Sequence, residues 1–468
     1  MATTYLERTI SSAGSRQKAT ISCWIKACKI GNDERFFSYE NSSVANDITV
    51  LKFLGKSNAR MTLQFADQTG GSNNARWDGS INLADNAAWY HFLVSLDTTQ
   101  ATEANRFKVY INGVLTTNNI QGTYTYPSQN SNLNIGHNSN CSLTLGRWKS
   151  SNSQYFDGLM AQCIYTDGYA YDATTFGEVN SVSGIWTGNT SPTVTYGTNG
   201  YHVDFANSAD MGNDVSGNAN DFTIGGTLTQ TKDCPDNNFS VSNINDNLFF
   251  GAAMTNGNTT VATPAASGEY SYGTTTLGIP DNKKIYYEVK PISVTGGSYD
   301  PRIGIVSSPT TSLTLSVGNT TYAYGLQGSN GNIVTNNAGS SYGVATSLGD
   351  VIGVAVDTVN NKLYFAKNGV WMNSGDPTSG STGTGAISIA ELEVAAGASD
   401  NVYNSGHYFP AISDEANTAG LTYSWNFGNG YFGTTAISSA GTAASTPGDF
   451  EYDVPTGYQP LTTKGLNA

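Results

Sequence analysis

Residues 351–371 read VIGVAVDTVNNKLYFAKNGVW, and this stretch indicates the fold class of the chain. Apolar residues dominate 351–356 and return in 362–367, and both runs have the length of short β-strands. Only residues 357–361 separate the two runs, and Asn368-Gly369 follows the second one. Asn-Gly favours a two-residue hairpin turn because both turn positions need a positive φ. The stretch therefore predicts consecutive antiparallel strands joined by short turns.

Similar runs occur along the whole chain. Apolar and polar residues alternate in 19–27 and in 107–111, and the second run leads directly into Asn112-Gly113. Residues 285–289 and 302–306 predict further strands. Helical periodicity is nearly absent. The residues Glu, Lys, Arg and Gln, which stabilise the exposed faces of long helices, are also scarce. We therefore predict an all-β protein with two antiparallel, jelly-roll-like β-sandwich domains and helix confined to short turns.

Composition divides the chain into four parts. Residues 1–175 and 248–432 are rich in predicted strands, and each part is long enough to form a sandwich with its own core. Residues 176–247 are rich in Asn, Asp and Gly, and we interpret them as a connector that packs on the first domain. Residues 433–468 become rich in small residues and are then interrupted by prolines, which predicts an extended C-terminal arm.

The charge of the chain excludes several classes of partner. The formal net charge is −14 over 468 residues, and charged residues make up only 12%, about half the ~25% that is usual. The sequence has no cluster of Lys and Arg that could neutralise a run of phosphates, so we expect no nucleic-acid partner. No apolar run approaches the ~18 residues of a membrane span, so we expect no membrane insertion. Residues 1–15 lack the apolar segment of a secretory signal.

Catalytic patterns are weak in this sequence. Residues 339–343 fit G-x-S-x-G, but they lie among predicted strands rather than at a strand-to-helix turn. The densest carboxylates, at 391–393 and 449–453, lie outside the first domain and do not form a recognisable hydrolase pair. The five cysteines include no C-x-x-C, and we expect buried thiols rather than a disulfide framework or a metal site. We therefore expect a protein that is not an enzyme.

The first domain resembles laminin-G-like modules of the concanavalin A-like lectin type. The resemblance is carried by residues 19–27, 89–94, 107–113, 143–147 and 155–161, in that order. It implies a two-sheet sandwich that binds carbohydrate or protein.

The second domain resembles the SPRY family. The segments that carry the resemblance are residues 286–289, 322–325, 349–357, 363–371, 408–411 and 426–428. It implies a two-sheet antiparallel sandwich that binds partners through loops at one end and has no chemistry of its own.

The order of the parts is similar to that of virion proteins of tailed bacteriophages, with the stretch 214–222 between the two modules and a short tail over 448–461. This resemblance implies a tail fibre, spike or capsid-surface appendage that is assembled in the host cytoplasm and located in the virion. Its partners would be other virion proteins and a host-surface glycan or protein. Linked copies raise the avidity of weak sites, so we expect a homo-oligomer, with a trimer favoured. A cellular surface lectin or adhesin is the alternative.

Aromatic residues near the predicted loops of the second domain are the candidate ligand-binding residues. Sugar rings stack on aromatic faces while Asn and Asp oxygens bind their hydroxyls, and neither contact needs positive charge. The candidates are Tyr322, Tyr324, Trp371, Tyr403 and His407. The alternative for each is packing in the core or against a neighbouring strand.

A second candidate site lies in the predicted connector. Asp214, Ser216, Asn218, Asn220 and Asp221 present alternating oxygen-bearing side chains, and Ca²⁺ takes six to eight oxygen ligands. The alternative is an Asx turn that is held by its own side chains, because no bidentate Glu follows. Apart from this Ca²⁺ candidate we expect no cofactor.

Overall fold

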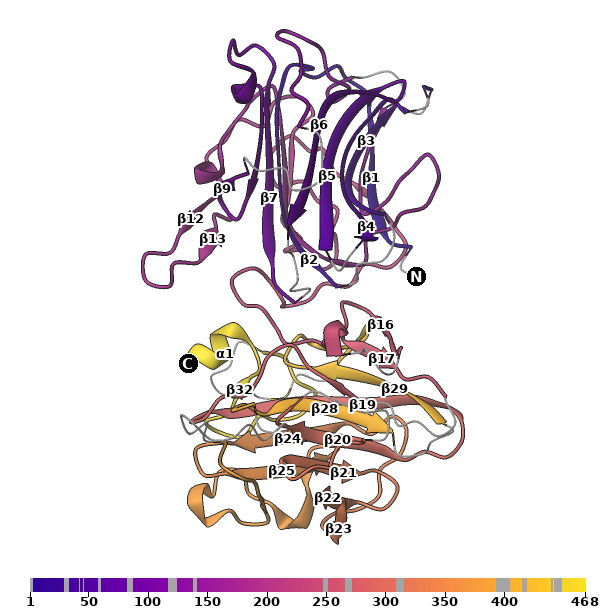
Figure 1. Ribbon diagram of the computed structural model, residues 1–468, viewed down its shortest axis with the longest axis vertical. Helices are drawn as coiled ribbons and strands as arrows, with labels where there is room; N and C mark the ends of the chain where they lie inside the picture. Colours follow the sequence, from indigo (N-terminus) through magenta and orange to yellow (C-terminus); the bar gives the residue numbers. More distant parts are fainter. Residues whose placement is uncertain are drawn as a thin grey trace. The chain divides into compact units, whose positions relative to one another are not determined.

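The computed structural model consists of two compact units, residues 1–230 and residues 231–468 (Figure 1). Each unit is described by itself. The structure describes residues 3–28, 33–41, 43–44, 46–57, 60–81, 87–116, 124–137, 141–246, 251–265, 272–308, 315–392, 405–414, 419–438, 441 and 448–468.

The first unit is a sandwich of two antiparallel sheets. The seven-stranded sheet has the order β15-β1-β10-β3-β4-β5-β6. Its strands are β1 (Tyr5–Ile10), β3 (Glu34–Asn41), β4 (Ile48–Ser57), β5 (Arg60–Thr69), β6 (Ser72–Ile81), β10 (Cys141–Leu145) and β15 (Thr223–Gly225). The six-stranded sheet has the order β14-β11-β2-β7-β8-β9. Its strands are β2 (Lys18–Ala27), β7 (Tyr90–Asp97), β8 (Phe107–Ile111), β9 (Val114–Leu115), β11 (Gly158–Asp167) and β14 (Tyr201–Val203).

The core of the first unit lies between these sheets. The alternation of β2 sends Ile21, Cys23 and Ile25 into it, where residues such as Phe65 and Leu143 of the other sheet meet them. A separate hairpin of β12 (Gly177–Val179) and β13 (Trp186–Gly188) follows the short 3-10 helix η2 (Ala173–Thr175). The predicted alternation therefore positions one face of each sheet toward the core.

The second unit is a second sandwich. Its nine-stranded sheet has the order β16-β17-β29-β19-β24-β25-β26, with β27 paired to β25 and β32 paired to β19. These strands are β16 (Ala253–Thr255), β17 (Thr260–Ala262), β19 (Lys284–Gly296), β24 (Ile352–Asp357), β25 (Lys362–Lys367), β26 (Val370–Trp371), β27 (Ile387–Ser388), β29 (Ala419–Asn426) and β32 (Gln459–Pro460). The six-stranded sheet has the order β18-β28-β20-β21-β22-β23. Its strands are β18 (Tyr272–Thr274), β20 (Pro301–Val306), β21 (Ala323–Gln327), β22 (Asn332–Thr335), β23 (Ala338–Ser341) and β28 (Phe409–Asp414).

The nine-stranded sheet is buried on both faces. Along β19, Ile285, Tyr287 and Val289 enter the core between the sheets. Tyr286 belongs instead to a smaller cluster on the opposite face, together with Phe450 and residues near it. The C-terminal segment, residues 448–460, therefore covers the outer face of this sheet, and the short helix α1 (Thr463–Asn467) ends the chain.

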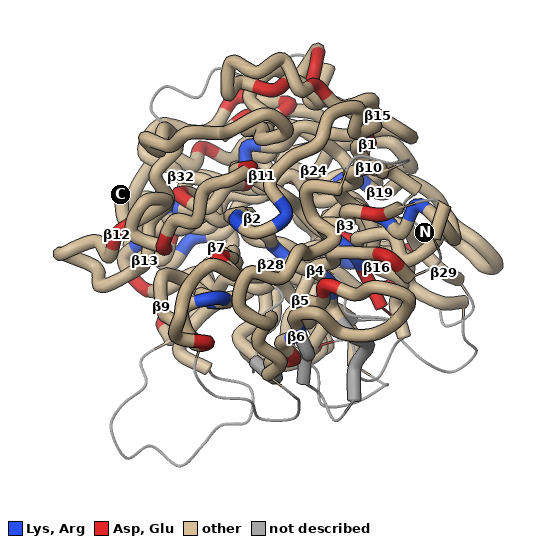
Figure 2. Tube along the Cα trace, turned by 90° about the horizontal axis from the view of Figure 1, so that it is seen from above, with Lys and Arg blue, Asp and Glu red and all other residues tan. Residues whose placement is uncertain are grey.

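Charged residues are sparse on both units. Figure 2 shows Lys and Arg scattered along the trace among acidic residues. Several form ion pairs, such as Lys18 with Asp97 at 3.3 Å and Lys284 with Asp357 at 2.9 Å. In the described part of the chain, no helix has the length and apolar character that a bilayer span requires.

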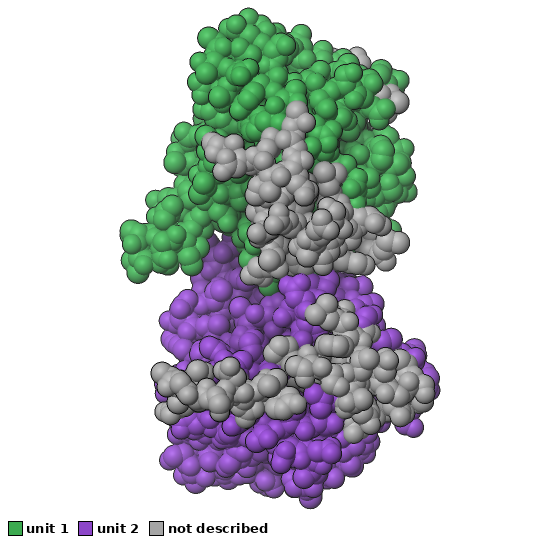
Figure 3. Space-filling view, in the orientation of Figure 1, with its two compact units in different colours: residues 1–230 green, residues 231–468 purple. Residues whose placement is uncertain are grey.

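The all-β fold class with antiparallel sandwiches is confirmed, and the predicted connector and arm contribute residues to the two compact units (Figure 3). The boundary between the compact units falls between residues 230 and 231 of the sequence, inside the stretch that we interpreted as a connector. Tyr201 and Phe222 are buried in the first core, and Phe239 is buried in the second. The arm contributes Leu461 to the core of the second unit. These aromatic and aliphatic side chains fix both segments, although neither alternates like a strand.

Candidate functional site

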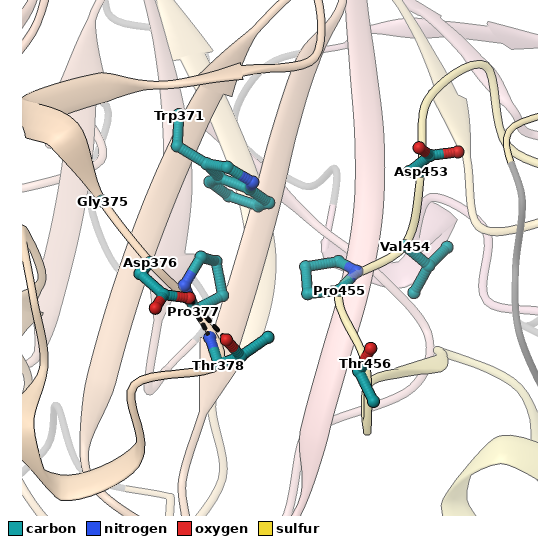
Figure 4. A pocket seen from close by; sticks show the side chains of 9 residues that line it. All are labelled: Trp371, Gly375, Asp376, Pro377, Thr378, Asp453, Val454, Pro455 and Thr456. Atoms are coloured by element: carbon teal, nitrogen blue, oxygen red, sulfur yellow. Dashed lines mark hydrogen bonds between the residues drawn. The ribbon is translucent and has the colours of Figure 1, made fainter.

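A polar groove of about 460 Å³ lies on the second unit, between two segments that are far apart in the sequence (Figure 4). One wall is the turn that follows β26, and the other is part of the C-terminal segment. The lining residues are Trp371, Gly375, Asp376, Pro377, Thr378, Asp453, Val454, Pro455 and Thr456. In Figure 4, Trp371 and Pro377 face Pro455 across the gap.

The β25–β26 hairpin positions Trp371. Asn368 and Gly369 form its turn with φ of 48° and 78°, as the Asn-Gly sequence predicts. The indole packs edge-on against Tyr286 and Tyr364, with ring centroids 6.3 Å apart in both cases. The ring is only half-buried. Trp371 is therefore a supported aromatic surface that remains accessible from the groove.

Asp376 provides the charge on the same wall. One of its carboxylate oxygens accepts hydrogen bonds from the backbone N–H of Thr378 at 2.9 Å and from its hydroxyl at 2.6 Å. These bonds lower the pKa of Asp376, with the hydroxyl of Thr378 as the largest cause. The side chain is exposed, so the groove presents an ionised acceptor at neutral pH.

The opposite wall is anchored from beneath. Val454 is buried, and the hydroxyl of Tyr458 donates to the carbonyl oxygen of Pro377 at 3.2 Å, which ties the two walls together. Phe450 packs edge-on against Tyr286 with ring centroids 5.0 Å apart. The exposed carboxylate of Asp453 therefore stands on a fixed segment.

Glu288 holds this wall to the sheet. Its carboxylate is fully buried and accepts from the backbone N–H groups of Glu451 and Tyr452, each at 2.9 Å. The hydroxyl of Tyr286 and the amide of Asn426 also donate to it, at 3.1 and 3.0 Å. Burial raises the pKa of Glu288 to about 7, although the hydrogen bonds act in the opposite direction.

The arrangement offers groups that can recognise a ligand. An indole face can stack on a sugar ring, and carboxylate oxygens can accept hydrogen bonds from hydroxyl groups. The lining residues include no Lys, Arg, His or Cys. The described residues also contain no group of three or more His, Cys, Asp or Glu side chains that could hold a metal ion.

The predicted aromatic residues are not brought together. Trp371 alone lies in the groove. Tyr324 is buried in the core, where its hydroxyl oxygen accepts from the N–H of Ala390 at 2.9 Å, and Tyr322 packs half-buried against the same core. His407 is exposed on the chain that leads into β28. Tyr403 lies outside the described residues.

The candidate Ca²⁺ loop is held by its own hydrogen bonds. The carboxylate of Asp214 accepts from the N–H groups of His202, Ser216 and Asn220 and from the hydroxyl of Ser216, at 2.8–2.9 Å. Asp221 accepts from the N–H of Asp214. The amides of Asn218 and Asn220 donate to backbone carbonyls. This is the Asx-turn arrangement that the sequence left open as the alternative.

His91 and Ser22 in the first unit are close but not arranged for nucleophilic catalysis. The Nε2 of His91 lies 2.8 Å from the Ser22 hydroxyl, and Trp186 donates its indole N–H to Nδ1 at 3.1 Å. In the neutral ring, Nε2 must therefore carry the proton and donate to Ser22. Burial lowers the pKa of His91 to about 3, so the ring stays neutral. The contact is structural.

Sequence reasoning missed Asp376, and it noted Asp453 only as part of the acidic stretch 449–453. Each begins a short turn-forming stretch, Asp376-Pro377-Thr378 in one wall and Asp453-Val454-Pro455-Thr456 in the other. The signal available in the sequence was that both stretches contain Asp, Pro and Thr, and that the first of them follows Trp371 closely. Their proximity, however, depends on how the C-terminal segment packs, and the sequence alone does not show this.

Comparisons with known proteins agree with the two sandwiches. Residues 2–165 match the Laminin_G_3 family, described as the concanavalin A-like lectin/glucanases superfamily, and residues 284–388 match the SPRY domain. A comparison with curated proteins gave no match.

Two solved structures illustrate the likeness. The SPRY domain of human HERC1 is 15% identical, with a TM-score of 0.27, and the match covers 37% of this chain and 91% of that one. A putative carbohydrate binding protein from Bacteroides ovatus ATCC 8483 is 14% identical, with a TM-score of 0.32, and the match covers 48% and 56%. The family matches themselves place a concanavalin A-like lectin/glucanase-type domain at residues 2–165 and a SPRY domain at residues 284–388.

Proposed function

We propose that this protein is a non-enzymatic recognition protein and that the groove of its second unit binds a saccharide. The observation that carries the proposal is the half-exposed ring of Trp371 on the same wall as the ionised carboxylate of Asp376. An aromatic face with hydrogen-bond acceptors beside it matches the apolar face and the hydroxyl groups of a sugar. The lectin-type family of the first unit supports a role in carbohydrate binding.

A glycan array with the full-length protein, followed by calorimetric titration of the strongest glycan, tests this proposal. Trp371→Ala should weaken binding by roughly tenfold or more, because it removes the stacking surface. Trp371→Phe should retain part of the affinity. Asp376→Asn should also weaken binding, whereas Asp281→Asn, an exposed acid away from the groove lining, serves as the matched control. Equal affinity of Trp371→Ala and wild type would refute the groove as the site.

We further propose that the protein is a surface component of a bacteriophage particle, such as a tail fibre, spike or capsid appendage, and that it acts as a homo-oligomer. The order of lectin-like module, the stretch 214–222, SPRY module and short tail supports this role. Mass spectrometry of purified particles should detect the chain in several copies per particle. Its presence only in the envelope fraction of uninfected cells would instead show a cellular adhesin.

A further inference from the structure

Two cysteines meet in the core of the first unit. Cys23 lies in β2 and Cys163 lies in the neighbouring strand β11, 140 residues later in the chain. Their Sγ atoms are 2.7 Å apart. This separation approaches the ~2.05 Å length of an S–S bond. The two sulfur atoms are therefore already in contact across the neighbouring strands.

A β-bulge brings the second sulfur into this position. The pairing of β2 with β11 shifts between Ala161 and Ile164, and Gln162 has a φ of 49°. The extra residue of a bulge redirects the side chains that follow it. As a result, Cys163 enters the core beside Cys23. Because Ala161 pairs with Trp24 and Ile164 pairs with Ser22, the two residues of the bulge, Gln162 and Cys163, lie opposite Cys23.

We propose that Cys23 and Cys163 form a disulfide that cross-links β2 to β11 when the protein folds under oxidising conditions. With oxidised glutathione as the oxidant, one thiolate attacks it, forms a mixed disulfide and releases one glutathione. The second thiolate then displaces the other glutathione and closes the S–S bond. The two cysteines lose two protons and two electrons, and the glutathione disulfide takes up both electrons and becomes two thiols.

The surroundings make this pairing selective. The Sγ of Cys28 lies 3.7 Å from the carbonyl oxygen of Lys26, and the Sγ of Cys141 lies 3.7 Å from Nδ1 of His137. Cys23 and Cys163 are almost completely buried, so glutathione cannot reach them in the folded domain. Burial also raises the pKa of the Cys23 thiol, which makes its thiolate scarce there. The exchange must therefore take place while the strands assemble.

Refolding of the full-length protein tests the proposal. The protein is unfolded with a reductant, refolded with or without oxidised glutathione, unfolded again in an alkylating reagent and digested with trypsin. Cys23 then lies in the peptide 19–26 and Cys163 in the peptide 150–232, and neither peptide contains another cysteine. We expect these two peptides to be joined after oxidative refolding, with three of the five cysteines alkylated. The unfolding temperature should rise by roughly 5–10 °C, because the link restricts a long loop of the unfolded chain.

Cys163→Ala should abolish both the joined peptide and the rise in unfolding temperature. Cys141→Ala, which changes a buried cysteine of the same unit, is the matched control and should retain both. Five alkylated cysteines in oxidatively refolded wild-type protein would overturn the proposal, as would a link from Cys23 to any other cysteine. These two outcomes are read from the wild type and do not depend on whether a variant folds.

Discussion

Glu288 places a carboxylate beneath the C-terminal wall of the groove, where it makes the second unit sensitive to pH. Burial raises its pKa to about 7 in the folded protein, whereas the ordinary value is 4.5. The folded form therefore holds the proton more tightly than the unfolded chain does. This contribution to stability is complete below pH 4.5 and is lost as the pH rises through about 7.

We expect the free energy of unfolding of the second unit to fall by about 2.5 kcal/mol between pH 5 and pH 8. Glu288→Gln cannot ionise, so its stability should change less over this range. Asp281→Asn is the control and should retain the wild-type slope. Hydrogen exchange of peptides from β19 and β29 measures this unit in the intact chain. A flat or rising wild-type profile in these peptides would contradict the role of Glu288.

The measurement must resolve the units, because His91 acts in the opposite direction in the first one. Its folded pKa of about 3 lies below the ordinary 6.5. The corresponding stability is present above pH 6.5 and is lost as the pH falls toward 3. Unfolding followed by one global signal would mix the two effects.

Gly304 shows how closely two strands approach in the six-stranded sheet of the second unit. A Cβ at this position of β20 would lie 1.8 Å from the backbone oxygen of Tyr324 in β21. We expect Gly304→Ala to lower the free energy of unfolding by more than about 2 kcal/mol, since the backbone must move to relieve the overlap. Gly273 in β18 has open space around its Cβ position. Gly273→Ala should thus be nearly neutral in the same denaturant titration, and similar losses for both variants would contradict the steric explanation.

At the level of elements, strands with a strong local pattern were predictable. The alternation and the Asn-Gly turn of residues 351–371 correspond to β24, β25 and β26. The C-terminal segment was not predictable in this way. Phe450, Val454 and Tyr458 lie outside the strands and pack on the outer face of a sheet that forms elsewhere in the chain. For the same reason Trp371 could be named from the sequence, whereas the opposite wall of its groove could not.

The C-terminal segment should therefore stabilise the second unit as well as line its groove. Phe450 is fully buried against Tyr286. We expect Phe450→Ala to lower the free energy of unfolding by about 3–5 kcal/mol in denaturant titrations. The same variant should lower the affinity of the groove for its ligand. Val370→Ala shortens a largely exposed side chain beside Trp371 and is the control. An unchanged stability of Phe450→Ala would mean that the segment is not held against the sheet in solution.

At the level of the whole molecule, charge limits how the protein can find its ligand. The net charge of −14 repels polyanionic surfaces at low ionic strength, and Lys and Arg are scattered among acidic residues along the trace in Figure 2. Attraction at a distance toward acidic glycans is therefore absent. Affinity must come from short-range stacking and hydrogen bonds, as in the groove beside Trp371.

Such binding should tolerate salt. The Debye length shrinks from about 10 Å at 0.1 M to about 3 Å at 1 M, which screens distant charges but leaves contacts within a groove nearly unchanged. We expect the Kd for a neutral glycan to change less than about twofold between 0.05 and 0.5 M NaCl, and the affinity for an acidic surface to rise as repulsion is screened. Calorimetric titration across this range measures the Kd for the neutral glycan. The affinity for an acidic surface is measured by comparing retention of the protein on sulfated and uncharged matrices as the salt concentration rises. A steep loss of affinity with added salt would show that ion pairs dominate, which would contradict binding by stacking and hydrogen bonds.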